Sequence, residues 1–318
     1  MKTREAPEEP IAVVGAGTIG AGWAAFFALK GQRVQVYDPA PSAPELVART
    51  LERARPVMAA LGQLAANPTT PRVCADVAIA VEGARHVQES LPEDLDLKRR
   101  VYAQIEAIAR PDAVLASSSS GLLPSVLQQG MRHPQRMLVV HPNNPPYLMP
   151  LVEVVAGRCT APTVVDSTVA LFDTLGKRTI VLKREVTGHL FNRLQAALWR
   201  EAVHLVSKGY ASVEDVDRAV TEGLGARWMV CGPLEILHLA GGDAGLAGAL
   251  DSLGPALTAW WDDLGQPQLD AATRQTLIEG MNDALKGRPY AERASRRDRL
   301  LTPLLAGAAR GFAKTDRD

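Results

Sequence analysis

The chain has 318 residues, 47% hydrophobic and 22% charged, which is typical of a globular protein with one large domain or two smaller ones. Lys+Arg and Asp+Glu both number 35, so the formal net charge of +0 disfavours nucleic acid and anionic membrane surfaces as partners. Three isolated cysteines and the absence of a long apolar run argue against a disulfide framework, a cysteine zinc site and a transmembrane helix. We expect a reducing cytoplasm, no metal, and a frayed N-terminus over residues 1–10 rather than a signal peptide.

A glycine-rich turn follows the first apolar run. The run 11–14 is typical of a buried parallel strand, and Gly15-Ala-Gly-Thr-Ile-Gly20 separates it from an apolar helix. Gly15 permits a tight turn, Gly17 lets the backbone approach a pyrophosphate, and Gly20 lets helix and strand pack closely. The helix N-terminus offers free N–H groups to the phosphates, so this context favours a dinucleotide site over a glycine turn of another α/β protein. The expected cofactor residues of the turn are Gly15, Gly17, Thr18, Ile19 and Gly20.

An acid closes the next strand. Residues 34–37 form the second expected strand, and Asp38 stands at its carboxyl end, 18 positions after Gly20. A carboxylate at this place accepts hydrogen bonds from the adenosine ribose hydroxyls. Pro39 follows, with no arginine beside it for a 2′-phosphate, so the sequence favours NAD over NADP.

Strands continue to alternate with helices up to residue 187. This alternation predicts an α/β domain over 11–187 with a doubly wound, Rossmann-type, mostly parallel sheet. Ligands bind such sheets at the carboxyl ends of the strands, where Asp38, Glu89, the run Ser117–Ser120 and His141 all fall. Later strands are expected near 72–77, 86–89, 113–116, 137–140, 151–155 and 179–182, and helices at 45–61, 95–108, 122–129 and 163–175.

The strand pattern ends after residue 187. Leucines at 190, 194, 198 and 205 recur at helical spacing, and Ser212 with Asp215 predicts the capped start of another helix. We therefore predict an all-α second domain over 188–318. Its further helices are expected at 244–262, 270–285 and 289–301, with loops at 223–232 and 262–269.

One stiff turn joins a histidine to an acid. An apolar strand runs into His141, a turn with four prolines follows, and a second apolar strand carries Glu153. Proline fixes φ and removes a donor, so neither strand continues through the turn. The turn is expected to bring His141 and Glu153 together, so that the acid fixes the tautomer of a histidine base. Pairing of Glu153 with a buried arginine is the structural alternative.

Several pieces of the chain between Ile11 and about Gly242 resemble the L-3-hydroxyacyl-CoA dehydrogenase superfamily. Besides the glycine turn, they are Glu89-Ser-Leu-Pro-Glu-Asp-Leu-Asp-Leu-Lys-Arg99, the serine run with Leu122-Leu-Pro124, His141-Pro-Asn-Asn-Pro-Pro146, Gly223-Leu-Gly-Ala-Arg-Trp228 and Gly232-Pro-Leu-Glu235. They are most similar to the branch of L-gulonate 3-dehydrogenase and lambda-crystallin, and also similar to carnitine 3-dehydrogenase. Two departures are Asp94, where many members have asparagine, and Pro142-Asn143, where CoA-type members have aromatic residues. The second departure disfavours a CoA substrate.

The resemblance implies a site that oxidises a secondary alcohol. His141 would take the hydroxyl proton while hydride moves to NAD, and Glu153 would stabilise the imidazolium. Ser120 and Asn192 would hold the reacting oxygen, with Asn192 reaching the cleft from the second domain. The structural alternatives are helix capping by Ser120 or Asn192 and solvated positions for Glu93 and Lys98. The resemblance also implies cofactor contacts at Glu93, Lys98 and Ser118 and a substrate contact at Asn144.

Three kinds of 3-hydroxy compound remain candidate substrates. The main prediction is a small free acid such as L-gulonate; the alternatives are a 3-hydroxyacyl-CoA and carnitine. A CoA phosphate would need cations, for which three arginines on one expected helix are candidates, and a carnitine ammonium would need an aromatic cage. The arginines are Arg49, Arg53 and Arg55, and the cage candidates, which core or interface packing also explains, are Trp228, Trp260 and Trp261.

Arg227 and Trp228 are the expected substrate contacts in the second domain. Arg227 lies in a glycine-punctuated loop, and its guanidinium matches a carboxylate bidentately. A surface position, or pairing with Glu222 or Glu235, is the alternative.

Two expectations concern the whole protein. A non-catalytic, crystallin-like NAD-binding protein is the function of another class, but such a protein has no need of the complete set of four catalytic residues. The apolar helix face of the second domain is expected to form a homodimer. Its candidate residues are Leu234, Ile236, Leu237 and Leu239.

Overall fold

The computed structural model describes residues 9–315, with side chains described up to residue 309. The expectation of a frayed N-terminus therefore falls, up to residue 8, outside the described residues. Contacts divide the chain into two compact units, one up to Arg193 together with Asp298–Ala306, and one of Leu194–Arg297 with Gly307 onward. None of the helices within residues 9–315 is long and apolar enough to cross a membrane.

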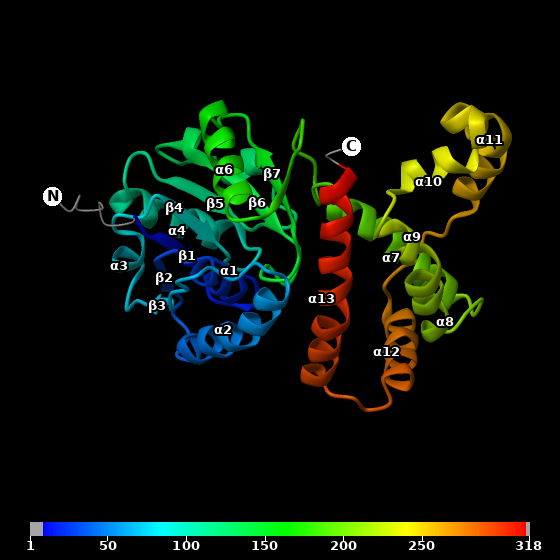
Figure 1. The fold of residues 1–318 in the computed structure, drawn as a ribbon, viewed down its shortest axis with the longest axis horizontal. Helices are drawn as coiled ribbons and strands as arrows, with labels where there is room; N and C mark the ends of the chain where they lie inside the picture. Colours follow the sequence, from blue (N-terminus) through cyan, green and yellow to red (C-terminus); the bar gives the residue numbers. More distant parts are fainter. Residues whose placement is uncertain (1–8, 316–318) are drawn as a thin grey trace. The chain divides into compact units, whose positions relative to one another are not determined.

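The first unit is built on one eight-stranded sheet, ordered β3-β2-β1-β4-β5-β6-β7-β8 (Figure 1). Every neighbouring pair is parallel except β6 and β7, which are antiparallel. This order confirms the predicted doubly wound, mostly parallel sheet. The strands are β1 (Ile11–Val14), β2 (Val34–Tyr37), β3 (Arg72–Val73), β4 (His86–Glu89), β5 (Val114–Ser117), β6 (Met137–Pro142), β7 (Leu151–Ala156) and β8 (Arg178–Val181).

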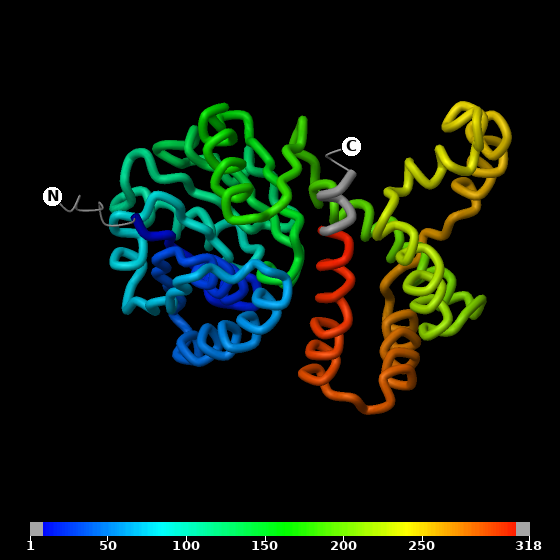
Figure 2. The backbone as a smooth tube through the Cα atoms, viewed as in Figure 1, coloured from blue at the N-terminus to red at the C-terminus, as the bar shows by residue number. Residues whose placement is uncertain are grey.

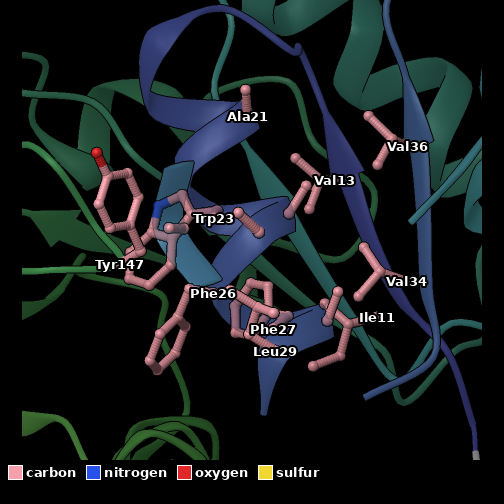
Figure 3. Close-up of a cluster of buried hydrophobic side chains, with 14 of the residues drawn as sticks. Ile11, Val13, Ala21, Trp23, Phe26, Phe27, Leu29, Val34, Val36 and Tyr147 are labelled. Carbon is pink, nitrogen blue, oxygen red and sulfur yellow. The ribbon is translucent and has the colours of Figure 1, made fainter. Parts of the chain in front are cut away.

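Helices cover both faces of the sheet, which explains why the central strands are apolar throughout. In β1, Ile11 and Val13 pack into one buried cluster with Trp23 and Phe27 (Figure 3), whereas Ala12 and Val14 pack into the cluster on the other face. The helices are α1 (Thr18–Leu29), α2 (Ala43–Ala60), α3 (Val77–Val81), α4 (Leu95–Ile108), α5 (Pro124–Leu127), η1 (Pro134–Arg136) and α6 (Pro162–Thr174).

The second unit is helical, and Figure 2 follows its backbone from green through yellow to orange. Ser212 caps α8 as predicted, because its hydroxyl accepts the Asp215 N–H at 3.1 Å. The prediction of a loop over 223–232 is wrong, since most of that stretch is helical. The remaining helices are α7 (Phe191–Ser207), α8 (Val213–Arg218), the π-helix η2 (Ala219–Leu224), α9 (Gly225–Trp228), α10 (Pro233–Ala240), η3 (Gly242–Ala244), α11 (Gly245–Asp263), α12 (Ala271–Leu285) and α13 (Tyr290–Thr315).

Part of α13 packs in the first unit, although it lies more than a hundred residues beyond the predicted boundary at 187. Asp298 is buried and accepts hydrogen bonds from Arg53 Nε at 2.9 Å and from the Tyr147 hydroxyl at 3.0 Å. Leu301 and Leu305 lie against the buried cluster that holds Trp23. Residues 298–306 of α13 thus support the sheet domain, which their sequence position does not indicate.

Candidate active site

His141 and Glu153 face each other across the antiparallel strands β6 and β7, where they are direct register partners. The His141 Nδ1 and Glu153 Oε2 atoms are 2.6 Å apart, and the side chains are only 5% and 2% exposed. Burial alone would raise the pKa of Glu153, but hydrogen bonds from His141, Phe191 and Leu190 outweigh it and lower the pKa. A charged Glu153 accepts the Nδ1–H, so His141 presents Nε2 as its basic atom.

The start of α7 holds the other oxygen of Glu153. The backbone N–H groups of Leu190 and Phe191 both donate to Glu153 Oε1 at 2.8 Å. Free N–H groups at a helix start favour a negative charge, so these contacts keep the carboxylate ionised and fixed. Glu153 therefore pairs with His141 and a helix start, and not with a buried arginine.

Glu93 shapes the loop that carries Ser120. Its Oε1 atom accepts hydrogen bonds from the Ser119 hydroxyl at 2.6 Å and from the Ser120 and Gly121 N–H groups, both at 2.8 Å. Burial would raise the pKa of Glu93, but these donors outweigh it and lower the pKa. Glu93 is thus more than a solvated helix-end acid, and Ser120 is exposed on the loop that Glu93 organises.

Asn192, near the start of α7, completes the set around His141. Its Nδ2 atom donates to the Ser120 carbonyl at 3.2 Å and lies 3.5 Å from His141 Nε2. The sequence placed Asn192 in the second domain, whereas contacts place it in the first unit with Ser120, His141 and Glu153. These four predicted residues therefore come together within one unit.

A buried group of polar side chains lies beside this loop. Glu89 is fully buried and accepts hydrogen bonds from Lys98 Nζ at 2.7 Å, the Tyr102 hydroxyl at 2.6 Å and the Ser117 hydroxyl at 2.6 Å. Lys98 is itself 0% exposed and also lies 3.6 Å from Glu93. Lys98 therefore joins two acids under the loop and is not a solvated helix lysine. Its expected contact with the cofactor stays a prediction.

The glycine turn has the shape that a pyrophosphate needs. A Cβ atom on Gly15, which has a φ of +92°, would stand 2.7 Å from the Ser90 carbonyl oxygen, whereas a Cβ on Gly17 would meet no atom within 4 Å. The Gly17 backbone is therefore open for a phosphate at the start of α1, near Thr18 and Ile19. Asp38 accepts the Ala16 N–H at 2.6 Å, so the ribose-facing acid and the turn form one structure.

Ser118 is half-buried in a polar cluster beside the glycine turn. Its hydroxyl oxygen lies 2.9 Å from the Ser90 hydroxyl and accepts hydrogen bonds from Trp23 Nε1 at 3.1 Å and Gln88 Nε2 at 2.8 Å. Ser118 thus links the end of β5 to the middle of α1, and its contact with the cofactor also stays a prediction.

Two models of one protein family match the chain in succession. The NAD-binding domain of 3-hydroxyacyl-CoA dehydrogenase matches residues 10–186, and its C-terminal domain matches residues 188–285. The chain belongs to the 3-hydroxyacyl-CoA dehydrogenase family. NAD is its cofactor, and it is a dehydrogenase that acts on a hydroxyl group.

Relatives of this family member are named L-carnitine dehydrogenase. That of Streptomyces griseus is 44% identical over 96% of this chain and 92% of its own length. That of Pseudomonas aeruginosa is 40% identical over 95% and 96%. These names support the carnitine alternative better than the L-gulonate and lambda-crystallin branch that the sequence motifs favoured.

Solved structures of the family share the fold. An NAD⁺-dependent 5-formyl-3-hydroxy-2-methylpyridine 4-carboxylic acid 5-dehydrogenase superposes with a TM-score of 0.80, at 32% identity over 93% of this chain and 97% of its own. The 3-hydroxybutyryl-CoA dehydrogenase of Escherichia coli superposes with a TM-score of 0.62, at 26% identity over 86% and 57%.

His189 is a site residue that the sequence analysis missed. It is fully buried, its φ is 51°, and its ring centroid lies 5.2 Å from that of His141. Its Nε2 atom lies 2.9 Å from the Ser119 carbonyl oxygen and donates to it. Burial lowers the pKa of His189, so this second imidazole stays neutral beside His141. Gly188, which also has a positive φ, was the only sequence signal of an unusual backbone here.

Of the predicted substrate residues, Asn144 lies three positions after His141, whereas Arg227 and Trp228 lie far along the chain from the catalytic set. Asn144 is exposed in the turn that follows His141. Arg227 and Trp228 are exposed on α9 of the helical unit, and within residues 9–315 Arg227 forms no ion pair with Glu222 or Glu235. Their part in substrate binding stays a prediction.

Proposed function

We propose that this protein oxidises the 3-hydroxyl group of L-carnitine with NAD as the hydride acceptor. The observation that carries this proposal is the identity of 44% and 40%, across nearly whole chains, with the L-carnitine dehydrogenases of S. griseus and P. aeruginosa. Carnitine is a free 3-hydroxy acid, so it also fits the small-acid chemistry that the turn after His141 favoured. L-gulonate becomes the second candidate.

Each residue of the catalytic set has one role in this reaction. NAD, when bound, accepts the hydride from the carbinol carbon. His141 Nε2 takes the hydroxyl proton, and the charge that results on the imidazole is balanced by Glu153 at 2.6 Å. Ser120 and Asn192 align the hydroxyl oxygen and then donate to the carbonyl oxygen of the product.

The ion pair that Arg53 of α2 forms with a buried carboxylate argues against a CoA substrate. Arg53 Nη2 lies 2.9 Å from the buried carboxylate of Asp298, and Arg49 lies 4.0 Å from Glu45. A guanidinium that is committed to an internal carboxylate is not available to a 3′-phosphate. Arg49 pairs only with the exposed Glu45 and stays available, so the cationic cluster that would favour an acyl-CoA is reduced to Arg49 and Arg55.

The two charged ends of carnitine need different partners. We assign the carboxylate to Arg227, whose guanidinium matches it bidentately, and the trimethylammonium group to the face of Trp228. Trp228 is 38% exposed, which leaves its ring accessible. Trp260 and Trp261, 60% and 65% exposed on α11, are further candidates for the aromatic cage or for an interface.

Initial rates with NAD on a panel of hydroxy acids test the function. The panel holds L-carnitine, L-gulonate, 3-hydroxybutyrate and 3-hydroxybutyryl-CoA. We expect the highest kcat/KM with L-carnitine, because only this substrate carries both charges. A higher kcat/KM with L-gulonate or with the CoA ester would overturn the proposal. Turnover of any of the four would reject a purely structural, crystallin-like role.

The assembly that we propose is a homodimer formed through the helical unit. On α10, Leu234 and Leu239 are 72% and 59% exposed, and Ile236 and Leu237 are partly exposed beside them. Exposed apolar side chains gathered on one short helix in this way mark an interaction surface. A closed two-fold pair would bury the same face of both copies.

A further inference from the structure

The turn between β6 and β7 connects the two strands that carry His141 and Glu153. We call residues 143–150 the catalytic turn. Inside it, the N–H groups of Leu148 and Met149 both donate to the Pro145 carbonyl at 3.0 Å. Three of its eight residues are prolines and have no N–H to donate, so side chains from other elements must help to hold its carbonyl groups.

Lys177, just before β8, supplies such a contact. Its ammonium group donates to the Met149 carbonyl at 2.7 Å and to the Pro146 carbonyl. The side chain is only 7% exposed. One buried amino group therefore holds two carbonyl oxygens of the catalytic turn.

The same ammonium group touches the cofactor helix α1. Lys177 Nζ lies 4.1 Å from the centroid of the Phe26 ring and 5.7 Å from that of Trp23, which are cation–π distances. Figure 3 shows Tyr147 of the catalytic turn in the same buried cluster as Trp23 and Phe26. Lys177 thus joins the turn that follows His141 to the helix that begins at the glycine turn.

The contact between α1 and the turn is close even without the lysine. A Cβ atom on Gly22 would stand 2.6 Å from Pro146 Cδ, so the helix and the turn meet at a glycine. Any loosening of the turn would therefore change how Pro146 packs on the cofactor helix. Because β6 runs directly into the turn, the position of His141 would change with it.

A charge at this place is costly. Burial lowers the pKa of Lys177 to about 7, and the like charge of Lys30 adds to the effect. An apolar side chain would fill the same space without this cost, but it would leave the Pro146 and Met149 carbonyls without the lysine. The hydrogen bonds of Lys177 to these two carbonyls therefore explain its presence better than packing does.

We propose that Lys177 is a positioning residue for the reaction, which clamps the catalytic turn onto α1 and so sets His141 relative to the hydride acceptor. The inference rests on the proposed catalytic role of His141 and Glu153, but not on the identity of the substrate. Hydride and proton transfer need alignment to a fraction of an ångström, and a displacement of about 1 Å can cost about 10²-fold in rate.

The test compares Lys177→Met, which keeps the length but removes the ammonium, with Lys177→Gln, which keeps two N–H donors. Lys183→Met, at an exposed lysine of the same unit, is the matched control. For Lys177→Met we expect kcat to fall about 10- to 100-fold, with the Kd for NAD changed less than about threefold. Lys177→Gln should recover part of kcat, and Lys183→Met should match the wild type.

A kinetic isotope effect separates positioning from loss of folded protein. With substrate deuterated at the carbinol carbon, the isotope effect on kcat should rise in Lys177→Met, because a misaligned hydride transfer becomes rate-limiting. A smaller amount of folded enzyme lowers kcat without moving this ratio. If Lys177→Met does not fold, the same measurement on Lys177→Gln serves.

Two results would overturn the proposal. One is a folded Lys177→Met enzyme with kcat within about twofold of the wild type. The other is a loss of kcat with an unchanged isotope effect and no recovery in Lys177→Gln. All rates are measured with the substrate of the panel that has the highest kcat/KM. If that substrate is not L-carnitine, the proposed function is refuted, but the comparison of the Lys177 variants remains valid.

Discussion

At the scale of single residues, the His141–Glu153 pair carries the chemistry. Replacing the base in His141→Ala should lower kcat by about 10²–10⁴-fold, the usual span for general acid–base catalysis. The Kd for NAD should hardly change, because the glycine turn and Asp38 lie on other strands. Steady-state rates and isothermal titration calorimetry with NAD measure the two quantities. A folded variant that keeps wild-type turnover would refute the assignment.

The free energy of unfolding should depend on pH through Lys177, and the lowered pKa of this residue determines the direction of the change. The pKa is about 7 in the folded chain against 10.5 for a free lysine, so between these values the unfolded chain binds the extra proton. The free energy of unfolding should therefore gain up to about 1.4 kcal/mol per pH unit from this group as pH rises through that window. Urea unfolding at several pH values from 7 to 10 should show this gain in the wild type relative to Lys177→Met. Parallel pH dependences of the two proteins would contradict the prediction.

The sequence pointed to the catalytic pair and, through the family resemblance, to Ser120 and Asn192, but not to His189 or Lys177. Two apolar strands and a proline-rich turn were enough to bring His141 and Glu153 together, because pairing across antiparallel strands is regular. His189 reaches His141 through a left-handed backbone conformation at residue 189. The residue type does not predict this conformation, because a positive φ is uncommon for residues other than glycine. Lys177 reaches the catalytic turn through the order of β7 and β8, which the sequence pattern does not specify in such detail.

At the scale of elements, residues 223–232 were predicted to form a loop but are mostly helical, and the reason is local. Gly223 and Gly225 suggested a loop, because glycine costs a helix about 1 kcal/mol relative to alanine. In the structure a Cβ on Gly225 would stand 2.9 Å from the Val220 carbonyl oxygen, so the close turn of η2 onto α9 requires a glycine there. Packing thus outweighed helix propensity.

The contact of α13 with the first unit should be measurable as stability. Asp298→Ala removes the acceptor for Arg53 and for the Tyr147 hydroxyl, so the free energy of unfolding should fall by about 1.5–3 kcal/mol, as for hydrogen bonds to a charged group. Arg299→Ala, at an exposed neighbour on the same helix, should change it by less than about 0.5 kcal/mol. Urea unfolding measures both. Equal changes in the two variants would mean that Asp298 does not anchor the helix.

At the scale of the whole molecule, the two units differ in how they cover their apolar side chains. The sheet of the first unit buries apolar residues on both faces, and its large side chains Trp23 and Phe27 are 0% exposed. In the helical unit Leu234, Leu239 and Trp261 are 72%, 59% and 65% exposed. Composition alone did not separate the two units, because both are rich in leucine and alanine. The difference becomes visible only when the helices are placed.

This exposed surface predicts a dimer in solution. Light scattering at micromolar concentration should give about twice the chain mass of 34.0 kDa, because a self-complementary apolar face closes as a two-fold pair. Leu234→Asp combined with Leu239→Asp should shift the mass to one chain, since two charges would have to be buried in the interface. Ile108→Asp, at an apolar residue of the first unit that is 42% exposed, should leave the dimer intact. A wild-type protein with the mass of one chain would show that something other than a second copy covers α10, and a double variant that stays dimeric would place the interface elsewhere.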